Sequence, residues 1–122
     1  MQTPVQRAAR FSDLSPARQK LIRLCQEINY GSLRGLLIRE REPVFDPPPV
    51  LLVDIKLDCG TLARIETDLR DFVLKSETVQ LMDHLDRLVT TTIELLEVRA
   101  GIPRRLLLRV PSSEAVLLRT LT

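Results

Sequence analysis

The chain has 122 residues, of which 44% are apolar and 28% charged, and its net charge at pH 7 is +2. This size and balance predict a single globular domain that needs neither a metal nor a disulfide to fold, and they exclude a disordered chain. Aromatic residues make up 3% and Trp is absent. With so few rings, neither a carbohydrate-stacking site nor a base-stacking surface is expected.

The N-terminal part is predicted to be an arm followed by a helix. Residues 1–14 are expected to form a flexible basic arm. Ser15 and Pro16 then begin a helix, because serine caps helix N-termini and proline suits the first helical position. Gly31 is expected to end it, since glycine accepts the left-handed conformation past a helix end. The apolar residues between them recur at the spacing of one helix face: Leu21, Ile22, Cys25 and Ile28.

Three short strands are predicted next, at 33–39, 43–45 and 50–57. Gly35 interrupts the first of them and predicts a bulge or a close backbone approach. Pro43 cannot donate to a ladder, so the second strand is expected at a sheet edge. The run of three prolines before the third strand predicts a stiff polyproline II segment.

A long helix is predicted from Thr67 to Val89, with Thr67 as its N-cap. The apolar stripe of this helix slips near Ser76 and Glu77. Because a continuous helix keeps one apolar face, the slip predicts a kink or a break into two helices at this point.

A hairpin closes the predicted sheet. Its strands are expected at 92–99 and 102–110, joined by Ala100 and Gly101. A short terminal element is expected at 112–121, because serines that can cap a helix precede a final group of apolar residues.

The predicted elements repeat after sixty residues, in the order helix, break, strand and turn. We therefore predict an α+β domain at 15–122, whose α-β-β halves at about 15–57 and 67–110 share one mostly antiparallel sheet, with both helices on one of its faces. An internal duplication would explain the repeat, as would the general likeness of any two α-β-β segments. Identical pairs at this spacing include Leu21/Leu81, Leu36/Leu96, Arg39/Arg99 and Pro43/Pro103. The expected core residues include Ile22, Leu36, Leu85, Leu88, Leu96 and Val98.

The sequence offers few groups for catalysis or metal binding. His84 is the only histidine, so any pair of base and nucleophile has to include it. The candidate enzyme site is accordingly Asp54, Asp58, Cys59 and His84, although a solvated histidine flanking the apolar stripe is the preferred interpretation. Cys25, Cys59 and His84 follow no metal-ligand spacing, and no glycine-rich phosphate loop occurs. We expect no enzymatic activity, no cofactor and no metal.

The two cysteines follow no pairing motif, and the sequence shows no signal peptide. A reducing, cytoplasmic compartment is therefore expected. No apolar run approaches the roughly 18 residues of a membrane-spanning helix, so no membrane partner is expected.

Basic residues concentrate toward both ends of the chain. Residues 1–30 carry five basic and two acidic groups, and residues 93–122 carry five and three, whereas residues 31–92 carry eight and eleven. If the two basic ends share a face, they form a phosphate-binding surface. The alternative is a set of solvated arginines, partly paired with Glu94 and Glu97. The candidate nucleic-acid-binding residues are Arg7, Arg10, Arg18, Arg99, Arg104, Arg105 and Arg109.

The sequence favours a non-enzymatic protein-interaction module, acting as a homodimeric adaptor or accessory subunit. Two observations lead there: no catalytic constellation occurs, and apolar strand and terminal positions exceed what one small core requires. The first alternative is a small nucleic-acid-binding protein that uses the basic arm and the last hairpin. An enzyme with a site near Asp54, Cys59 and His84 ranks third.

Overall fold

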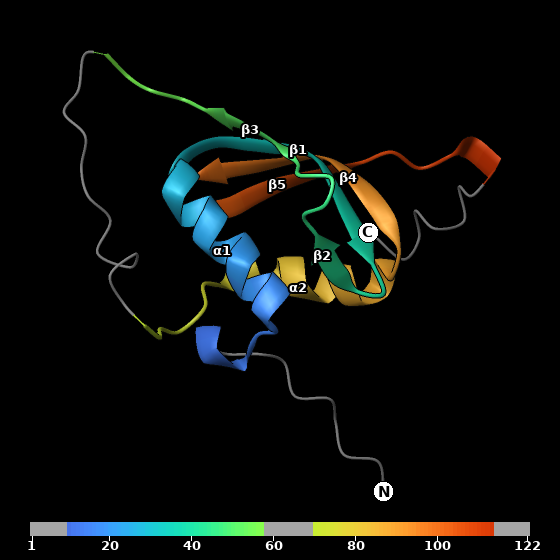
Figure 1. Ribbon diagram of the computed structural model, residues 1–122, viewed down its shortest axis with the longest axis horizontal. Helices are drawn as coiled ribbons and strands as arrows, with labels where there is room; N and C mark the ends of the chain where they lie inside the picture. The colour runs from blue at the N-terminus through green and yellow to red at the C-terminus, as the bar shows by residue number, and fades with distance from the viewer. Residues whose placement is uncertain (1–9, 58–69, 114–122) are drawn as a thin grey trace, which may run out of the picture.

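The computed structural model describes residues 10–57 and 70–113, and it has two layers (Figure 1). Two helices lie against one face of a five-stranded antiparallel sheet, which confirms the predicted α+β class. The elements in chain order are η1 (Phe11–Asp13), α1 (Pro16–Ile28), β1 (Tyr30–Arg39), β2 (Glu42–Val44), β3 (Val50–Val53), α2 (Ser76–Leu88), β4 (Thr91–Arg99) and β5 (Ile102–Leu108).

The long strands β1 and β4 form the centre of the sheet. They run antiparallel, with Leu33 opposite Leu96 and Leu36 opposite Ile93. β5 pairs with the outer edge of β4. The outer edge of β1 pairs with two separate strands, β2 at one end and β3 at the other. Pro43 lies in β2, so the proline is in an edge strand, as predicted.

Two predicted strands are shorter in the structure. β3 ends at Val53 and β5 at Leu108, instead of at Leu57 and Val110. For β3 the reason is the length of its neighbour: Val53 lies opposite Gly31, one residue after the start of β1. The Asp54 N–H still donates to the carbonyl of Tyr30, the first residue of β1, and beyond Asp54 β1 offers no further backbone to pair with.

The first helix begins as predicted and ends earlier than predicted. The Ser15 hydroxyl accepts a hydrogen bond from the Arg18 backbone N–H at 3.2 Å, and Pro16 occupies the first helical position. The helix ends at Ile28, and Asn29 caps it with a φ of 62°. Among residues other than glycine, asparagine is enriched at positive φ, and the Asn29 N–H donates to the Cys25 carbonyl at 3.0 Å. The prediction of Gly31 as the end was therefore wrong.

The second helix is shorter than the sequence predicted. α2 begins at Ser76, so the expected helix from Thr67 was wrong for residues 70–75; Thr67 itself lies outside the described residues. Residues 71–73 instead contact the N-terminal segment, where Phe72 stacks on Phe11 with ring centroids 5.0 Å apart. The slip in the apolar stripe marks the start of the helix and not a kink within it.

The last part of the predicted N-terminal arm belongs to the folded body. Phe11 and Leu14 are each only 6% exposed. The Phe11 backbone N–H donates to the Phe72 carbonyl at 2.9 Å, and the Arg10 guanidinium binds Asp71 at 2.8 Å. Residues 10–14 are therefore part of the folded domain and not of an arm; residues 1–9 lie outside the described residues.

Asp71 makes the attachment of this segment sensitive to acid. The Arg10 side chain and the Ser12 backbone N–H hold the pKa of Asp71 at about 2, below its usual value of 3.8. Because the pKa is lowered in the folded state, the stabilisation is complete above pH 4 and is lost as the pH falls toward 2. We expect wild type to lose urea resistance over this range, relative to Asp71→Asn. Parallel curves for the two proteins would contradict the assignment.

The core lies between the helices and the sheet. Of the six residues predicted for it, five are buried, and Leu88 is only half-buried. The five buried residues are Ile22, Leu36, Leu85, Leu96 and Val98. Core positions on the strands therefore follow from alternation, whereas Leu88, the last residue of α2, is only partly covered.

The two halves of the domain have matching local geometry. α1 and α2 have thirteen residues each and start sixty residues apart. Their caps, Asn29 and Val89, have φ values of 62° and 61°. Two hydrogen bonds cross between the halves in equivalent positions, from Gly101 N–H to the Asn29 carbonyl (2.8 Å) and from Arg41 N–H to the Val89 carbonyl (2.7 Å). The fold is thus two-fold pseudosymmetric; a duplication as its origin stays a prediction.

Candidate interaction surface

The most exposed apolar part of the described chain is β3 and its continuation, Val50–Leu57, called the edge segment below. All eight of its residues are exposed. Six are aliphatic, and the exposed fraction reaches 71% for Ile55 and 95% for Leu57. In Figure 1 the segment leaves β1 at one corner of the sheet and extends away from the body. Such a run of solvated aliphatic side chains is typical of a surface that binds another protein.

The edge segment presents free backbone as well as apolar side chains. One edge of β3 pairs with β1, and among the described residues no strand pairs with its other edge. The Asp54 N–H donates to the Tyr30 carbonyl at 2.7 Å, so the backbone groups of Asp54 face β1. Neighbouring residues of a strand alternate in this direction. Within β3, the N–H and C=O groups of Leu51 and Val53 therefore point away from the sheet.

Gly31 allows β3 to approach β1. A Cβ atom at position 31 would lie 1.9 Å from the Leu52 carbonyl oxygen and 2.9 Å from Ile28 Cγ2. The backbone there has a φ of 155°, a conformation that side chains other than glycine rarely adopt. The position of the edge segment thus depends on a single glycine in the first strand.

The sheet face opposite the helices is uncovered in the described part of the chain and mixes apolar and charged residues. One row across the strands runs Leu52, Ser32, Glu97, Arg105, and the next runs Val50, Arg34, Leu95, Leu107. One hollow of about 440 Å³ lies toward Tyr30 and Arg99, and another of about 640 Å³ lies toward Gly35 and Arg109. Arg34 and Leu95 line both hollows.

Three of the candidate nucleic-acid-binding arginines belong to this face, and each has a glutamate partner. Arg99 and Arg105 lie 3.6 and 3.9 Å from Glu97, and Arg109 lies 2.5 Å from Glu94. Their positive charge is therefore partly neutralised, as the alternative interpretation of the sequence anticipated. Arg34 joins them as a residue that the sequence analysis did not select, and within the described ranges it has no ion-pair partner.

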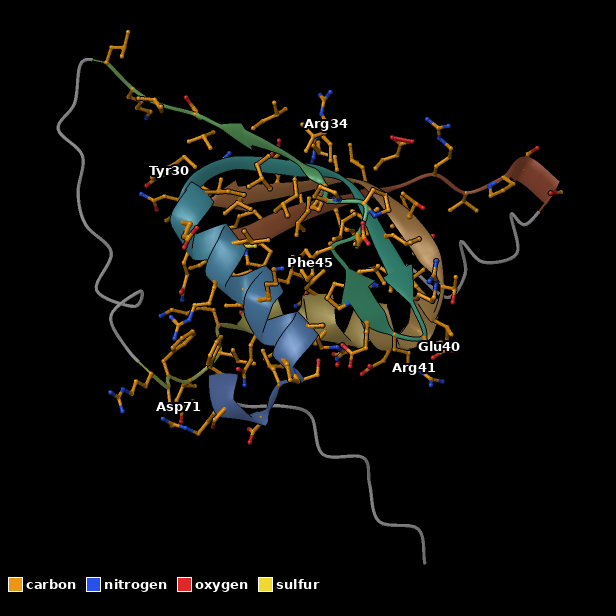
Figure 2. All side chains as sticks on the ribbon, in the orientation of Figure 1. Tyr30, Arg34, Glu40, Arg41, Phe45 and Asp71 are labelled. Carbon is orange, nitrogen blue, oxygen red and sulfur yellow. The ribbon has the colours of Figure 1, made fainter. Side chains whose placement is uncertain are left out.

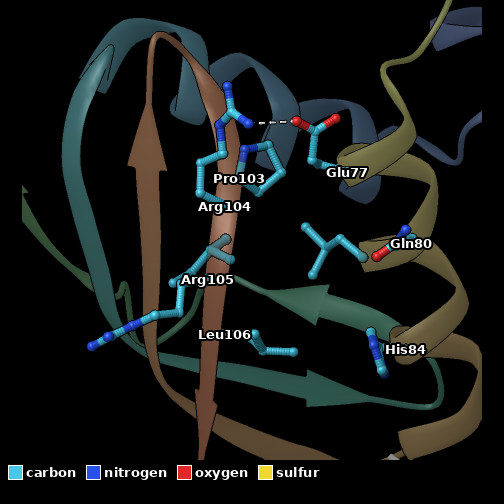
Figure 3. Close-up of a pocket in the computed structure, with 9 residues that line it drawn as sticks. Glu77, Gln80, His84, Pro103, Arg104, Arg105 and Leu106 are labelled. Carbon is cyan, nitrogen blue, oxygen red and sulfur yellow. Dashed lines mark hydrogen bonds and ion pairs between the residues drawn. The ribbon is translucent and has the colours of Figure 1, made fainter. Parts of the chain in front are cut away.

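The other candidate arginines lie elsewhere. Arg104 turns toward the helix layer and binds Glu77 of α2 at 2.6 Å (Figure 3). Arg10 binds Asp71, which lies far from Arg34 in Figure 2. Arg7 is outside the described residues. The structure therefore divides this set over several surfaces, and nucleic-acid binding stays a prediction.

Arg18 connects separate segments of the fold through ion pairs and hydrogen bonds. Its side chain is only 12% exposed and reaches Asp86 of α2 at 2.5 Å and the Arg41 carbonyl at 2.8 Å. Glu42 lies 3.7 Å away and accepts a hydrogen bond from the Ser15 hydroxyl at 2.7 Å. Arg18 thus joins the start of α1 to the β1–β2 turn and to the end of α2, and little of its charge is available to a ligand.

His84 and Asp54, the two described members of the candidate enzyme site, lie apart. His84 lines a hollow of about 310 Å³ between α2 and β5, together with Gln80 and Leu106 (Figure 3). Asp54 lines the hollow beside Tyr30 at the edge segment. Asp58 and Cys59 lie outside the described residues. The His84 Nδ1 atom is buried and has no hydrogen-bond partner in the described structure, so no described carboxylate orients the imidazole.

Cys25 is fully buried in the core, and burial raises the pKa of its thiol to about 12. The thiolate that nucleophilic chemistry needs is therefore not populated at neutral pH. Within residues 10–57 and 70–113, no three His, Cys, Asp or Glu side chains gather as metal ligands. The helices in these ranges are too short and too polar to cross a membrane.

The edge segment and the uncovered sheet face thus combine exposed apolar side chains, free strand backbone and partly neutralised charge. Comparison of the chain with protein-family models, with curated proteins and with solved structures finds no match.

Proposed function

We propose that this chain is a non-enzymatic protein-interaction module that self-associates through the edge segment, in the role of a homodimeric adaptor or accessory subunit. The observation that carries the proposal is the exposure of all eight residues Val50–Leu57, six of them aliphatic. Burying one such side chain contributes about 1.5–3 kcal/mol. A free monomer leaves this stabilisation unused.

The edges of the sheet differ in how they are protected against pairing. Natural proteins protect edge strands with prolines and charged side chains. β2 contains Pro43, and β5 contains Pro103 and two exposed arginines. The strand β3 has neither a proline nor a charge within Val50–Val53. This contrast supports the edge that begins with β3 and continues to Leu57 as the one that associates.

Self-association can be tested by sedimentation equilibrium on the purified chain. Interfaces built from short strands are small, so a dissociation constant in the micromolar range is expected. Ile55→Ser should raise this constant at least about tenfold, because each dimer loses two buried side chains. Val73→Ser is the matched control, since Val73 is a similar β-branched residue with 63% exposure at a distant site. A strictly monomeric wild type, or equal effects of both variants, would refute the proposal.

Nucleic-acid binding is the second candidate function, supported by the four arginines of the uncovered face against only two glutamates. A titration with single-stranded DNA at roughly 50 and 200 mM salt distinguishes the two candidates. Binding that weakens by orders of magnitude between these conditions, and that weakens further in Arg34→Gln, would favour the second. Self-association without such binding favours the first.

A further inference from the structure

We infer that the partner of the edge segment is the edge segment of a second copy, paired antiparallel about a two-fold axis at Ile55. The inference rests on the proposed function and specifies its geometry. In this register Ile55 faces its own copy, Asp54 faces Lys56 of the second copy, and Val53 faces Leu57.

The direction of the backbone groups supports an axis at an odd-numbered residue. The N–H of Asp54 is used by the Tyr30 carbonyl, so the even-numbered residues face β1. In β3 the residues whose backbone groups point outward are Leu51 and Val53, and the inferred dimer continues this alternation to Ile55. With the axis at Ile55, its N–H and C=O exchange two hydrogen bonds with the same groups of the second copy. An axis at Asp54 would bring together groups that already face β1.

Charge complementarity selects Ile55 among the odd-numbered residues. The edge segment carries one acid, Asp54, and one base, Lys56, two residues apart. Only an axis midway between them places each opposite the other, which gives two ion pairs per dimer. An axis at Val53 would instead place Asp54 against an aliphatic residue. Opposite charges directly across an antiparallel pair are stabilising, and like charges there are destabilising.

Both charged side chains are available for this contact. Asp54 and Lys56 are exposed, and Asp54 has no ion-pair partner among the described residues. The Lys56 ammonium lies 6.0 Å from the centre of the Tyr30 ring, a distance at which a cation–π contact is weak. Pairing with a second copy therefore breaks no strong interaction of the monomer.

The test is a charge exchange followed by sedimentation equilibrium. Asp54→Lys places like charges at both contacts and should raise the dissociation constant about tenfold, and Lys56→Asp should do the same. An equimolar mixture of the two variants should regain wild-type affinity as a heterodimer, because one chain is then basic and the other acidic. The double variant D54K/K56D should regain it as a homodimer. Rescue by mixing is a result that a folding defect cannot give.

Controls for net charge are Arg39→Asp and Glu40→Lys, which make the same changes at two exposed positions. Arg39 is the last residue of β1, and Glu40, which follows it, lies at the far end of this strand from Tyr30 (Figure 2). Both should leave the dissociation constant unchanged. A monomeric wild type would refute the proposed function itself. If neither Asp54→Lys nor Lys56→Asp changes the dissociation constant of the dimer, only the register is refuted. The register is also refuted if Lys56→Asp raises the dissociation constant and Asp54→Lys does not.

Discussion

Gly31→Ala is expected to lower the free energy of unfolding by about 2–5 kcal/mol and to loosen β3 from β1. The added methyl group would lie 1.9 Å from the Leu52 carbonyl oxygen, which belongs to the backbone of the neighbouring strand and cannot rotate away. The φ of 155° adds strain for any residue with a Cβ atom. Overpacking and backbone strain each cost about 1–3 kcal/mol.

Gly35→Ala is the matched control for this variant. Gly35 also has a positive φ, of 70°, but a Cβ atom there would meet nothing within 4 Å. It should therefore cost only the backbone term, about 1 kcal/mol. Urea denaturation gives both values, and amide exchange of residues 50–53 reports on the docking of β3. Equal stability of the two variants would show that the close contact with Leu52 contributes nothing.

The sequence predicted which helices and strands are present better than it predicted the residues at which they begin and end. Hydrophobic periodicity located both helices and all five strands, because it reflects which side chains face the core. The ends depend on tertiary contacts that periodicity does not contain. Asn29, and not Gly31, caps α1. The second helix begins at Ser76 because the preceding residues bind the N-terminal segment.

The candidate arginines illustrate the same limit. Arg104 and Arg105 are adjacent in the sequence, but neighbouring strand residues point to opposite faces. One therefore binds a helix residue, and the other lies on the uncovered face. Alternation alone could have separated these two. The burial of Arg18 between α1, the β1–β2 turn and α2 could not have been predicted, because it needs three distant segments.

The edge segment was predicted as a strand but not as a site. Its sequence, with Asp54 and Lys56 between aliphatic residues, also fits a strand inside an antiparallel sheet, which buries one face and exposes the other. At the edge of the sheet, β3 pairs with β1 on one side only and its continuation runs past the end of β1, and all eight residues are exposed. The available signal was the lack of proline and charge in Val50–Val53 compared with the other two edge strands.

Leu85→Ala tests the core independently of the interaction surface, and it is expected to cost about 2–5 kcal/mol. Leu85 is 0% exposed, on the face of α2 that lies against the sheet. The loss combines the transfer energy of the removed atoms with the cavity that they leave. The free energy of unfolding of a domain of this kind is about 5–15 kcal/mol. The substitution should therefore remove a large share of it.

Leu88→Ala is the informative control, because the sequence pattern gives both leucines the same role. Leu88 is half-buried and lies one turn further along α2. Its replacement should cost clearly less, about 1 kcal/mol. Urea denaturation of both variants measures the difference. A loss below about 0.5 kcal/mol for Leu85→Ala would mean that α2 presents another face to the sheet, since a fully buried leucine cannot be removed so cheaply.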